Sequence, residues 1–498
     1  MSKTRDDFLF ATLDAISGPA GAALTGRQQA RNRVRTKGNN HSHNQGLSGK
    51  PIPRGDYWEK ELETLPRRRL EKLQLKWLQD HLEFAYQRSP YYRRSFDESR
   101  VKPGDVKRLE DLRQFPFTDK AVERDRQLAV PDLGDMVAVP EEEIVYVSAS
   151  SGSTGVATLS PFTQQDFDDF QNVESRLYWS MGMRPRDRYL HALNFTLFVG
   201  GPDVIGAQNL GALCIWAGTV ASDRLLHIMQ QFKPTITWTT PSYAWHLGET
   251  ALKQGIDPAR DLSIRKIIVA GEPGGSIPAT RKAIEELWGA DLYDFYGLSD
   301  IFGACAGMCA LKAGLHLAED NILLEVLDPK TNEPVQDGEK GEMVLTTLRK
   351  AARPMIRFRT GDIITRLPSG CPCGRTSSRI VVQGRLDDMF IVSGVNVFPG
   401  DIEYVVRGMK ELNGEYRVTV YTQDRLTRFD VEAESVGYVD GAGVRLGEHL
   451  GQQVKLRTGV RPSRVNILAD GTLPRATHKA KRLVVLGDAG EGLKGTCT

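Results

Sequence analysis

The chain has 498 residues, of which 40% are hydrophobic and 26% charged, and its formal net charge is +2 at pH 7. Such a length predicts about three structural units, and the composition is that of an ordinary globular protein. The near-neutral charge gives no reason to expect nucleic acid or a membrane as a partner, and no stretch approaches the roughly 18 apolar residues of a membrane span. Because the N-terminus lacks a secretory signal and cysteines are few, we expect a cytoplasmic protein without a disulfide framework.

The first 54 residues are polar, rich in Gly and Ser, and basic at residues 27–37. Such a segment cannot bury much apolar surface, so we interpret residues 1–54 as a flexible tail. Docking of its basic stretch onto an acidic surface is the alternative. Order is expected from Tyr57 on, and apolar residues from Leu70 to Phe84 recur at the spacing of an amphipathic helix.

A turn at residues 115–118 predicts a helix that is capped by Thr118 or Asp119. From residue 144 on, short apolar runs alternate with helical stretches. The runs expected to be strands lie at residues 144–147, 188–193, 212–217, 235–238 and 266–270, and the helices between them at 164–181, 221–231 and 278–288. Strands that alternate with helices predict a parallel sheet and an α/β architecture.

After residue 321 the predicted strands are shorter, at 322–327 and 341–348, which fits a small β-rich subdomain. A final α+β module carries strands at 417–421, 429–433 and 465–468. The expected organisation is a tail (1–54), a large N-terminal domain (55–384), a short joint (385–388), a small C-terminal domain (389–490) and an end segment (491–498).

A loop rich in Ser and Gly follows the first predicted strand and is expected to lie between that strand and a helix. Small residues let backbone N–H groups approach an anion, and hydroxyls add donors, so the loop suits phosphate binding. It is not a Walker A loop, because no Gly-Lys-Ser/Thr follows, and a plain linker is the alternative. Its residues are Ser150, Ser151, Gly152, Ser153, Thr154 and Gly155.

Four further segments follow in order along the chain. They are residues 293–300 (YDFYGLSD), 358–362 (FRTGD), 384–399 (GRLDDMFIVSGVNVFP) and 473–482 (LPRATHKAKR). Together with the loop, they resemble the signature segments of the adenylate-forming superfamily of acyl-CoA synthetases, adenylation domains and luciferases. Residues 57–58, 89–92, 240–243, 353–357 and 371–375 are similar to phenylacetate–CoA ligases, so the resemblance covers about residues 57–485.

The resemblance implies ATP-dependent activation of an aromatic carboxylic acid as an acyl-AMP, with release of pyrophosphate and transfer of the acyl group to CoA. One alternative is an adenylating ligase that passes the acyl group to an amine, a hydroxyl or a carrier protein. A second is a non-catalytic, zinc-bearing interaction protein. A homodimer is common among such relatives.

The matched positions imply a role for each residue of the nucleotide site. Ser151, Ser153 and Thr154 would hold the β- and γ-phosphates, and Ser299 would contact the α-phosphate. The adenine would stack on Tyr296 and be lined by Gly271, Glu272, Pro273 and Gly297. Asp300 would bind Mg²⁺, Asp362 would accept hydrogen bonds from the ribose, and Arg385 would support the ribose or phosphate.

Lys479 matches the lysine that bridges the α-phosphate and the substrate carboxylate in this superfamily. A solvated lysine is the alternative, and Lys481 lies close enough to compete for the role. The family usually has Gly where this chain has His478. Plain structural roles, such as a core tyrosine, a helix cap or a turn aspartate, compete for the other positions.

The resemblance also implies that the C-terminal domain moves as a lid between adenylation and thioester formation. Asp387 matches the hinge, and Gly394 and Val395 match a strip that lines the CoA tunnel. Gly394 is equally interpretable as a turn glycine.

Three cysteines and a histidine supply a complete Cys₃His set, which is typical of structural zinc. They are Cys309, His316, Cys371 and Cys373, and Cys305 is a fifth candidate. Buried free thiols beside a core histidine are the alternative.

The acyl pocket is expected to be flat and apolar, with Phe195, Phe198, Tyr243 and Phe302 as its candidates. Core packing is the alternative for each of these rings. The sequence also departs from the family pattern in the phosphate loop, which continues with Val156 and not with a lysine. These departures indicate a specialised relative, such as one that activates a hydroxy- or aminobenzoate in secondary metabolism.

Overall fold

The computed structural model of the chain describes most residues after the N-terminal tail. The described residues are 52–53, 55–130, 133–150, 157–193, 195, 200–272, 274–392, 395–423, 426–437, 442–474 and 482–486. The two predicted end segments therefore lie outside them, apart from Ile52 and Pro53. Among the helices of this described part, none is long and apolar enough to cross a membrane.

The first helices build a layer whose apolar residues are buried. The helix expected around Leu70 is α3 (Arg67–Arg88), which buries Leu70, Leu73 and Trp77. The neighbouring elements are α2 (Lys60–Glu63), α4 (Pro90–Glu98), α5 (Lys120–Ala129) and the 3₁₀ turns η1 (Pro103–Asp105), η2 (Leu109–Gln114) and η3 (Glu141–Glu143). The cap of α5 is Asp119, whose Oδ1 accepts hydrogen bonds from the N–H groups of Ala121 and Val122 at 2.9 Å.

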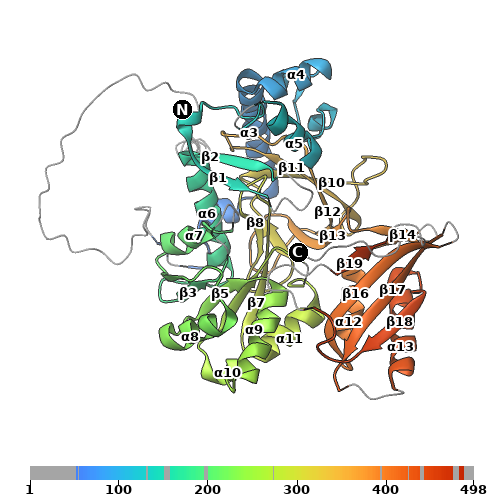
Figure 1. The fold of residues 1–498 in the computed structure, drawn as a ribbon. Coiled ribbons are helices and arrows are strands. Elements are labelled where there is room, and N and C mark those ends of the chain that lie inside the picture. The colour runs from blue at the N-terminus through green and yellow to red at the C-terminus, as the bar shows by residue number, and fades with distance from the viewer. Residues whose placement is uncertain are drawn as a thin grey trace, which may run out of the picture. The chain divides into compact units, whose positions relative to one another are not determined.

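An eleven-stranded mixed sheet dominates the described structure, and half of it confirms the predicted α/β pattern. Its parallel strands run in the order β7-β6-β5-β3-β4, and Figure 1 shows helices α8, α9 and α11 beside them in green. The strands are β3 (Arg188–His191), β4 (Leu213–Trp216), β5 (Ile236–Thr239), β6 (Lys266–Val269) and β7 (Asp291–Gly297). The helices are α6 (Gln164–Ser180), α7 (Asp203–Asn209), α8 (Ser222–Phe232), α9 (Pro241–Lys253), α10 (Pro258–Asp261) and α11 (Pro278–Trp288).

The β-rich segment after residue 303 continues this same sheet with antiparallel strands. Strand β8 pairs with β7, and the order proceeds through β9, β13, β12 and β11 to β10. The strands are β8 (Ala304–Met308), β9 (Leu315–Leu317), β10 (Ile322–Leu327), β11 (Lys340–Thr347), β12 (Phe358–Leu367) and β13 (Arg379–Arg385). The expected hairpin-rich region is therefore confirmed, and it shares backbone hydrogen bonds with the parallel half.

The strand predicted at residue 144 does not join the parallel strands. It is β1 (Ile144–Ala149), which pairs in antiparallel register with β2 (Leu159–Thr163) in a separate two-stranded sheet. The Ser- and Gly-rich loop thus links two strands, and the prediction of a strand-to-helix loop was wrong. The five-residue strand β2 contains a proline and has little apolar periodicity, so its sequence gave no clear strand signal.

The C-terminal module, from β14 to β19, has its own core and confirms the predicted α+β unit. A four-stranded sheet of order β18-β17-β16-β19 packs with α12 (Pro399–Gly408) and α13 (Ala442–Thr458). Val418, Val431 and Leu450 are fully buried in this core. The strands are β14 (Phe390–Val392), β15 (Val395–Val397), β16 (Leu412–Gln423), β17 (Leu426–Ser435), β18 (Arg464–Leu468) and β19 (Leu483–Val485).

Candidate active site

Three of the predicted nucleotide and acyl residues follow the C-terminal ends of the parallel strands. Tyr243 follows β5, Gly271 follows β6, and Ser299 follows β7. Ligands of open α/β sheets bind at this edge, because the loops after the strands converge there. The fold thus places these separate segments at one edge of one sheet.

The base of the predicted phosphate loop is held by hydroxyl hydrogen bonds. The Oγ of Ser150 accepts from the backbone N–H of Thr158 and from its Oγ1, both at 3.0 Å. Lys120, at the start of α5, donates from Nζ to Thr158 Oγ1 at 3.1 Å. The positions Ser151, Gly152, Ser153, Thr154 and Gly155 lie outside the described residues.

Asp300 lies beside this loop base as a buried carboxylate. The Nζ of Lys120 is 2.5 and 2.6 Å from its two oxygens, and Thr158 Oγ1 lies 3.2 Å from Oδ1. Burial by itself would raise the pKa of Asp300, but the charges of Lys120 and Arg353 hold it below the usual value. The carboxyl is therefore ionised before any ligand binds.

A second layer of buried charges supports Asp300. Lys350 donates from Nζ to Ser160 Oγ at 2.6 Å and to the carbonyl oxygen of Asp300 at 3.2 Å. Arg353 lies 2.8 Å from Glu123 in a buried ion pair. Burial lowers the pKa of Lys350 to about 7 and raises that of Glu123 to about 8. Both shifts are those expected of charged groups kept from water.

Tyr296, Asp362, Arg385 and Asp387 form a chain of polar contacts. The Tyr296 hydroxyl donates to Asp362 Oδ2 at 2.5 Å, and Arg385 Nη1 donates to Asp362 Oδ1 at 3.1 Å. The other Arg385 nitrogen, Nη2, donates to Asp387 Oδ2 at 2.8 Å. The predicted adenine, ribose and hinge residues are thereby brought into one network.

Glycine is required where β7 ends. A Cβ at Gly297 would lie 1.9 Å from the carbonyl oxygen of Gly303, which no side chain tolerates. Ser299, which is half-buried, comes two residues after Gly297. On the neighbouring loop, Gly271 has φ +88° and open space around its Cβ direction, and Glu272 Oε1 accepts from the N–H of Ser242 at 2.7 Å. Pro273 lies outside the described residues.

Comparison with known proteins matches this arrangement over most of the chain. Residues 91–348 match the AMP-binding enzyme family, and residues 394–485 match the AMP-binding enzyme C-terminal domain. The chain is 35% identical to the phenylacetate–coenzyme A ligase of Thermus thermophilus over 448 residues, which cover 86% of this chain and 99% of that one. The Pseudomonas putida enzyme of the same name is 36% identical over 84% of this chain and 94% of its own. The chain belongs to the phenylacetate–CoA ligase family of AMP-binding enzymes.

A solved structure agrees with this assignment. The 2-hydroxyisobutyryl-CoA ligase in its postadenylation state, in complex with 2-HIB-AMP, matches with a TM-score of 0.82 and 31% identity over 88% of this chain and 94% of that one. The predicted AMP-forming acid–CoA ligase, which activates an acid as an acyl-AMP and passes it to CoA, is confirmed by these relatives. An amine-, hydroxyl- or carrier-directed ligase and a non-catalytic zinc protein are not favoured.

The sequence reasoning missed one charged residue of the site in this chain. Lys120 contacts both Asp300 and the base of the phosphate loop, although 38 residues separate it from Thr158. Its only sequence signal is its place directly after Asp119, the cap of α5. The loop itself carries Val156 where the family usually has a lysine, so Lys120 provides a cation from another element.

The candidates for the acyl pocket do not share one environment. Phe302 is buried and its ring centroid lies 6.3 Å from that of Phe170. Phe195 is 40% exposed and stacks on Trp216 at 5.3 Å. The hydroxyl of Tyr243 lies 3.2 Å from Ser222 Oγ. Phe198 lies outside the described residues.

Two buried carboxyls, which the sequence reasoning did not single out, lie next to Phe302. Glu174 Oε1 accepts from the N–H of Ala304 at 2.8 Å, and a Cβ at Gly303 would lie 2.9 Å from Asp203 Oδ1. Burial raises the pKa of both carboxyls well above their usual values. The described part of the chain offers no hydrogen-bond partner to Glu174 Oε2 or to Asp203 Oδ1.

The predicted lid positions are described only in part. The side chain of Asp387 is 74% exposed. Val395 begins β15, whereas Gly394 and Lys479 lie outside the described residues.

The predicted metal ligands are brought together. The ligand atoms of Cys309, His316, Cys371 and Cys373 all lie within 4.8 Å of one another. Cys309 Sγ is 4.0 Å from Cys371 Sγ, and Cys373 Sγ is 3.4 Å from His316 Nε2. Two thiolates of a tetrahedral zinc site with Zn–S bonds of about 2.3 Å lie about 3.8 Å apart, so the four groups fit zinc. Cys305 is not part of this group.

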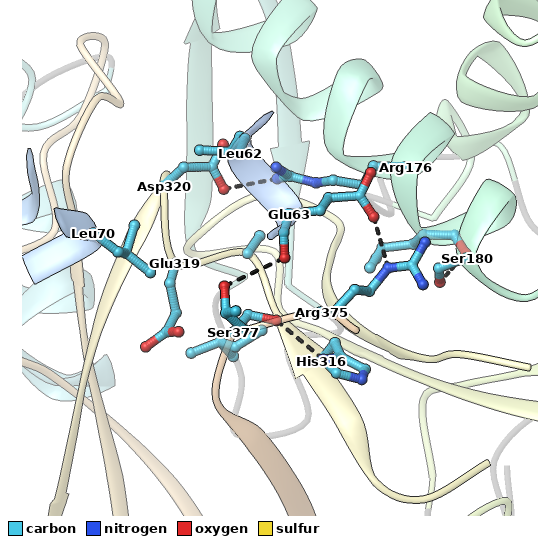
Figure 2. Close-up of a pocket in the computed structure, with 14 residues that line it drawn as sticks. Leu62, Glu63, Leu70, Arg176, Ser180, His316, Glu319, Asp320, Arg375 and Ser377 are labelled. Atoms are coloured by element: carbon cyan, nitrogen blue, oxygen red, sulfur yellow. Dashed lines mark hydrogen bonds and ion pairs between the residues drawn. The ribbon is translucent and has the colours of Figure 1, made fainter. Parts of the chain in front are cut away.

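The other nitrogen of the histidine in this cluster points toward a pocket. His316 Nδ1 lies 3.1 Å from Ser377 Oγ, and both residues line a pocket together with Glu63, Arg176 and Arg375 (Figure 2). Its charged groups are already paired, Arg176 with Asp320 at 2.7 Å and Arg375 with Glu63 at 2.6 Å. A charged substrate would have to break these buried pairs, so the pocket supports the fold and the histidine.

Proposed function

We propose that this AMP-forming ligase activates an aromatic carboxylic acid of the phenylacetate or benzoate type. The observation that carries the proposal is the identity of 34–36% to four curated phenylacetate–CoA ligases, over at least 84% of the chain. The buried Phe170–Phe302 pair next to the predicted pocket is in keeping with an aryl group.

The reaction has two steps. A carboxylate oxygen attacks the α-phosphorus of ATP, forms the new P–O bond and expels pyrophosphate. The CoA thiol, after loss of its proton, then attacks the acyl carbon and expels AMP. Catalysis of the first step is mainly positioning and neutralisation of charge. The Lys479 ammonium would bridge the α-phosphate and the carboxylate, and Ser299 would contact the α-phosphate.

For the triphosphate, we propose the loop with Ser150 at its base, together with Lys120. Oxygens of the β- and γ-phosphates would meet the hydroxyls of Ser151, Ser153 and Thr154 and the N–H groups around Gly152 and Gly155. Lys120 would supply the cation that this loop lacks. Its contact with Thr158, whose hydroxyl bonds Ser150, supports this role.

Asp300 is the proposed ligand of Mg²⁺. The residue fits a hard cation because its carboxylate is ionised and lies beside the loop base. The cation, when bound, would neutralise phosphate charge. In the structure, Lys120 neutralises Asp300. If Mg²⁺ bound to this carboxylate, the Lys120 ammonium would be able to pair with the phosphates instead.

The rest of the nucleotide would be held by the Tyr296 network. Asp362 would accept hydrogen bonds from the ribose hydroxyls, with Arg385 holding its carboxylate. The adenine would stack on Tyr296, with Gly297 on one edge and Gly271, Glu272 and Pro273 on the other side.

We place the domain boundary at residues 385–388, with Asp387 as the hinge. The family matches support this, because they leave residues 349–393 between the two domains. Gly394 and Val395 would line the CoA tunnel.

A structural zinc ion is proposed for the Cys₃His cluster. All four donors are protein side chains, which leaves no position for a reacting ligand. His316 would be oriented by Ser377, which lies at its other nitrogen. A reducing cytoplasm would keep these thiols from forming disulfides. Homodimerisation stays a prediction.

A small 2-hydroxy acid is the second candidate substrate. It is favoured by the 31% identity to the 2-hydroxyisobutyryl-CoA ligase and by the buried carboxyl of Asp203 beside Gly303, which suits a substrate hydroxyl. Thioester formation should be compared by kcat/KM across arylacetates, benzoates and 2-hydroxy acids. The proposal requires an aryl acid to exceed every 2-hydroxy acid by at least about 10-fold, and the reverse order would overturn it.

A further inference from the structure

Three buried polar side chains lie on two helices, α6 and α7, that pack against each other (Figure 1). Gln171 and Glu174 belong to α6 and are neighbours on one face of it, since three positions separate them. Asp203 is the first residue of α7. The exposed fractions of the three are 2%, 0% and 1%. The helices approach closely at this point, because a Cβ at Gly206 of α7 would lie 2.4 Å from the Cβ of Glu174.

The two carboxyls reach the segment that directly follows Phe302, a predicted residue of the acyl pocket. Glu174 Oε1 accepts from the N–H of Ala304 at 2.8 Å. Asp203 Oδ1 lies 2.9 Å from the place that a Cβ of Gly303 would take, so glycine is what allows this carboxyl to come so close. Both carboxyls therefore contact the chain within two residues of the buried Phe302 ring.

Each of the three side chains has polar atoms without a hydrogen-bond partner in the part of the chain that the structure describes. These atoms are Glu174 Oε2, Asp203 Oδ1, and Oε1 and Nε2 of Gln171. The buried carboxyl of Asp166, near the start of α6, is by contrast paired at both oxygens, which accept from the N–H groups of Ala351 and Ala352 at 2.6 and 2.8 Å. Buried polar atoms without partners are rare in native proteins, because they cost free energy. Several of them in one place indicate a polar group of a bound molecule.

The chemistry of these atoms favours a hydrogen-bond donor as that group. An ionised carboxylate only accepts hydrogen bonds, and Gln171 adds a further acceptor oxygen. Burial raises the pKa of Glu174 and of Asp203, because an ionised carboxylate kept from water is costly. A donor on the ligand would offset part of that cost, whereas an apolar group would leave the oxygens unpaired.

We propose that Gln171, Glu174 and Asp203 determine substrate specificity by binding an amino or hydroxyl group on the ring of the aryl acid. The inference rests on the proposed function, the activation of an aromatic carboxylic acid. The ring would lie against Phe302, and its substituent would reach the two carboxyls beside Gly303.

Methyl-substituted acids give the sharpest comparison, because a methyl group is close in size to an amino or hydroxyl group but donates no hydrogen bond. Thioester formation should be measured as kcat/KM for amino- and hydroxybenzoates and for the methylbenzoates with the same ring position. A site built to bind a donor rejects an analogue that lacks it, so one donor-bearing acid should exceed its methyl counterpart by about 100-fold. A ratio below about 10-fold at every ring position would overturn the inference.

Glu174→Gln and Asp203→Asn test the two carboxyls. Each amide keeps the shape of the side chain but replaces one acceptor oxygen by an NH₂ group, which donates. The ratio of donor-bearing to methyl-bearing acid should fall about 10-fold in each variant and further in the double variant. Both acids are measured on one preparation, so a loss of folded enzyme cancels in the ratio. An unchanged ratio in all three variants would mean that buried water alone occupies these atoms, and would overturn the inference.

The matched control is Asp294→Asn. Asp294 is also a buried carboxyl whose pKa is raised by burial, but Ser276 donates to it, and it lies on β7. The ratio should stay at its wild-type value in this variant. A fall as large as in Asp203→Asn would show that the ratio responds to any buried carboxyl, and the assignment would be wrong.

The same panel of acids keeps the inference apart from the proposed function. If benzoate or phenylacetate is activated as well as every donor-bearing acid, the aryl acid ligase stands and the inference is wrong. If 2-hydroxy acids exceed every aryl acid, the proposed aryl substrate fails, and a site for a ring substituent fails with it.

Discussion

The proposed nucleotide site and the Cys/His cluster both place ionisable side chains in the protein interior, but the groups around these side chains differ. At the nucleotide site each carboxylate has a cation beside it, as Lys120 lies beside Asp300 and Arg385 beside Asp362. These cations come from other elements and are about 41% exposed. In the cluster, the four ligand atoms lie within 4.8 Å of one another.

This difference indicates which of the two sites can exchange a side-chain partner for a bound ligand. A carboxylate that is kept ionised by a part-exposed lysine or arginine can trade that partner for a ligand at small cost. Crowded thiols would need a metal to stay deprotonated together, and a structural metal of the proposed kind would not be exchanged during the reaction. We therefore expect variants of the first site to change kinetics and variants of the cluster to change stability.

The largest effect is expected for Lys479→Ala. Loss of an ammonium aimed at the reacting phosphate should lower the rate of pyrophosphate release about 10²- to 10³-fold. Thioester formation from synthetic acyl-AMP should stay near the wild-type rate. Single-turnover assays of the two half-reactions measure both values, and an equal loss in both would contradict the role.

Lys120→Met should have the next largest effect. Without this cation the loop base loses its positive charge and the buried Asp300 loses its partner, so kcat/KM for ATP should fall about 10- to 100-fold. Steady-state kinetics with varied ATP measure this. The control is Lys102→Met, since Lys102 pairs with Asp97 on the exposed surface of the same region. A fall in kcat/KM in the control as large as in Lys120→Met would remove the assignment.

Asp362→Asn should weaken nucleotide binding by about 10-fold, because an amide accepts from ribose hydroxyls less strongly than a carboxylate. Tyr296→Phe, which frees Asp362 Oδ2 from the tyrosine hydroxyl, should weaken binding less. Calorimetric titration with a non-hydrolysable ATP analogue gives both values. Wild-type affinity in Asp362→Asn would show that the carboxylate does not hold the ribose.

Cys373→Ser tests the other side of the comparison. Removal of one of the four donors should lower the bound zinc well below one per chain and the unfolding temperature by a few degrees, since metal binding stabilises the folded state. The KM for ATP should not change. Elemental analysis and thermal unfolding are the measurements, with Cys214→Ser as the control outside the cluster. A metal-free wild-type protein would rule out the site.

The last prediction concerns stability alone and is a pH dependence at Asp294. Burial raises the pKa of this carboxyl to about 7, with Ser276 donating to it at 2.5 Å. A raised folded pKa stabilises the protonated form, so the contribution is present at acid pH and is lost as the pH rises from about 4 to about 7.

Asp294→Asn mimics the protonated acid and removes this dependence. The free energy of unfolding of wild type minus that of the variant should fall by up to about 1.4 kcal/mol per pH unit between pH 5 and 7, and be constant above pH 8. Urea titrations at four pH values measure it. A difference that does not change from pH 5 to pH 8 would contradict the buried, protonated state.

Periodicity predicted elements that bury an apolar stripe or run. The helix from Arg67 to Arg88 and the parallel strands β3, β4, β5 and β6 were predicted within a few residues, because their apolar residues recur at fixed spacing or in short runs. The fifth parallel strand, β7, was not among the predicted strands. Strand β2 was missed, because it is short, contains a proline and has little apolar periodicity. The sheet to which β1 belongs was wrongly predicted, since pairing depends on residues far along the chain.

The candidate site divides in the same way. The ligand set at Cys309, His316, Cys371 and Cys373 was predicted because each residue type has few other uses in a cluster. Lys120 was not, because a lysine is usually solvated and only its contacts with distant segments distinguish it. Tertiary geometry, and not residue type, identifies such residues.

The most direct test of the central claim is acid-dependent pyrophosphate release without CoA and then with it. The account predicts a burst of about one pyrophosphate per active site when ATP and an aryl acid are added alone, because the acyl-AMP stays bound. Addition of CoA should convert the burst into continuous release, with one thioester and one AMP formed per pyrophosphate. Release of phosphate and ADP, or no acid-dependent release over a broad panel of acids, would contradict it.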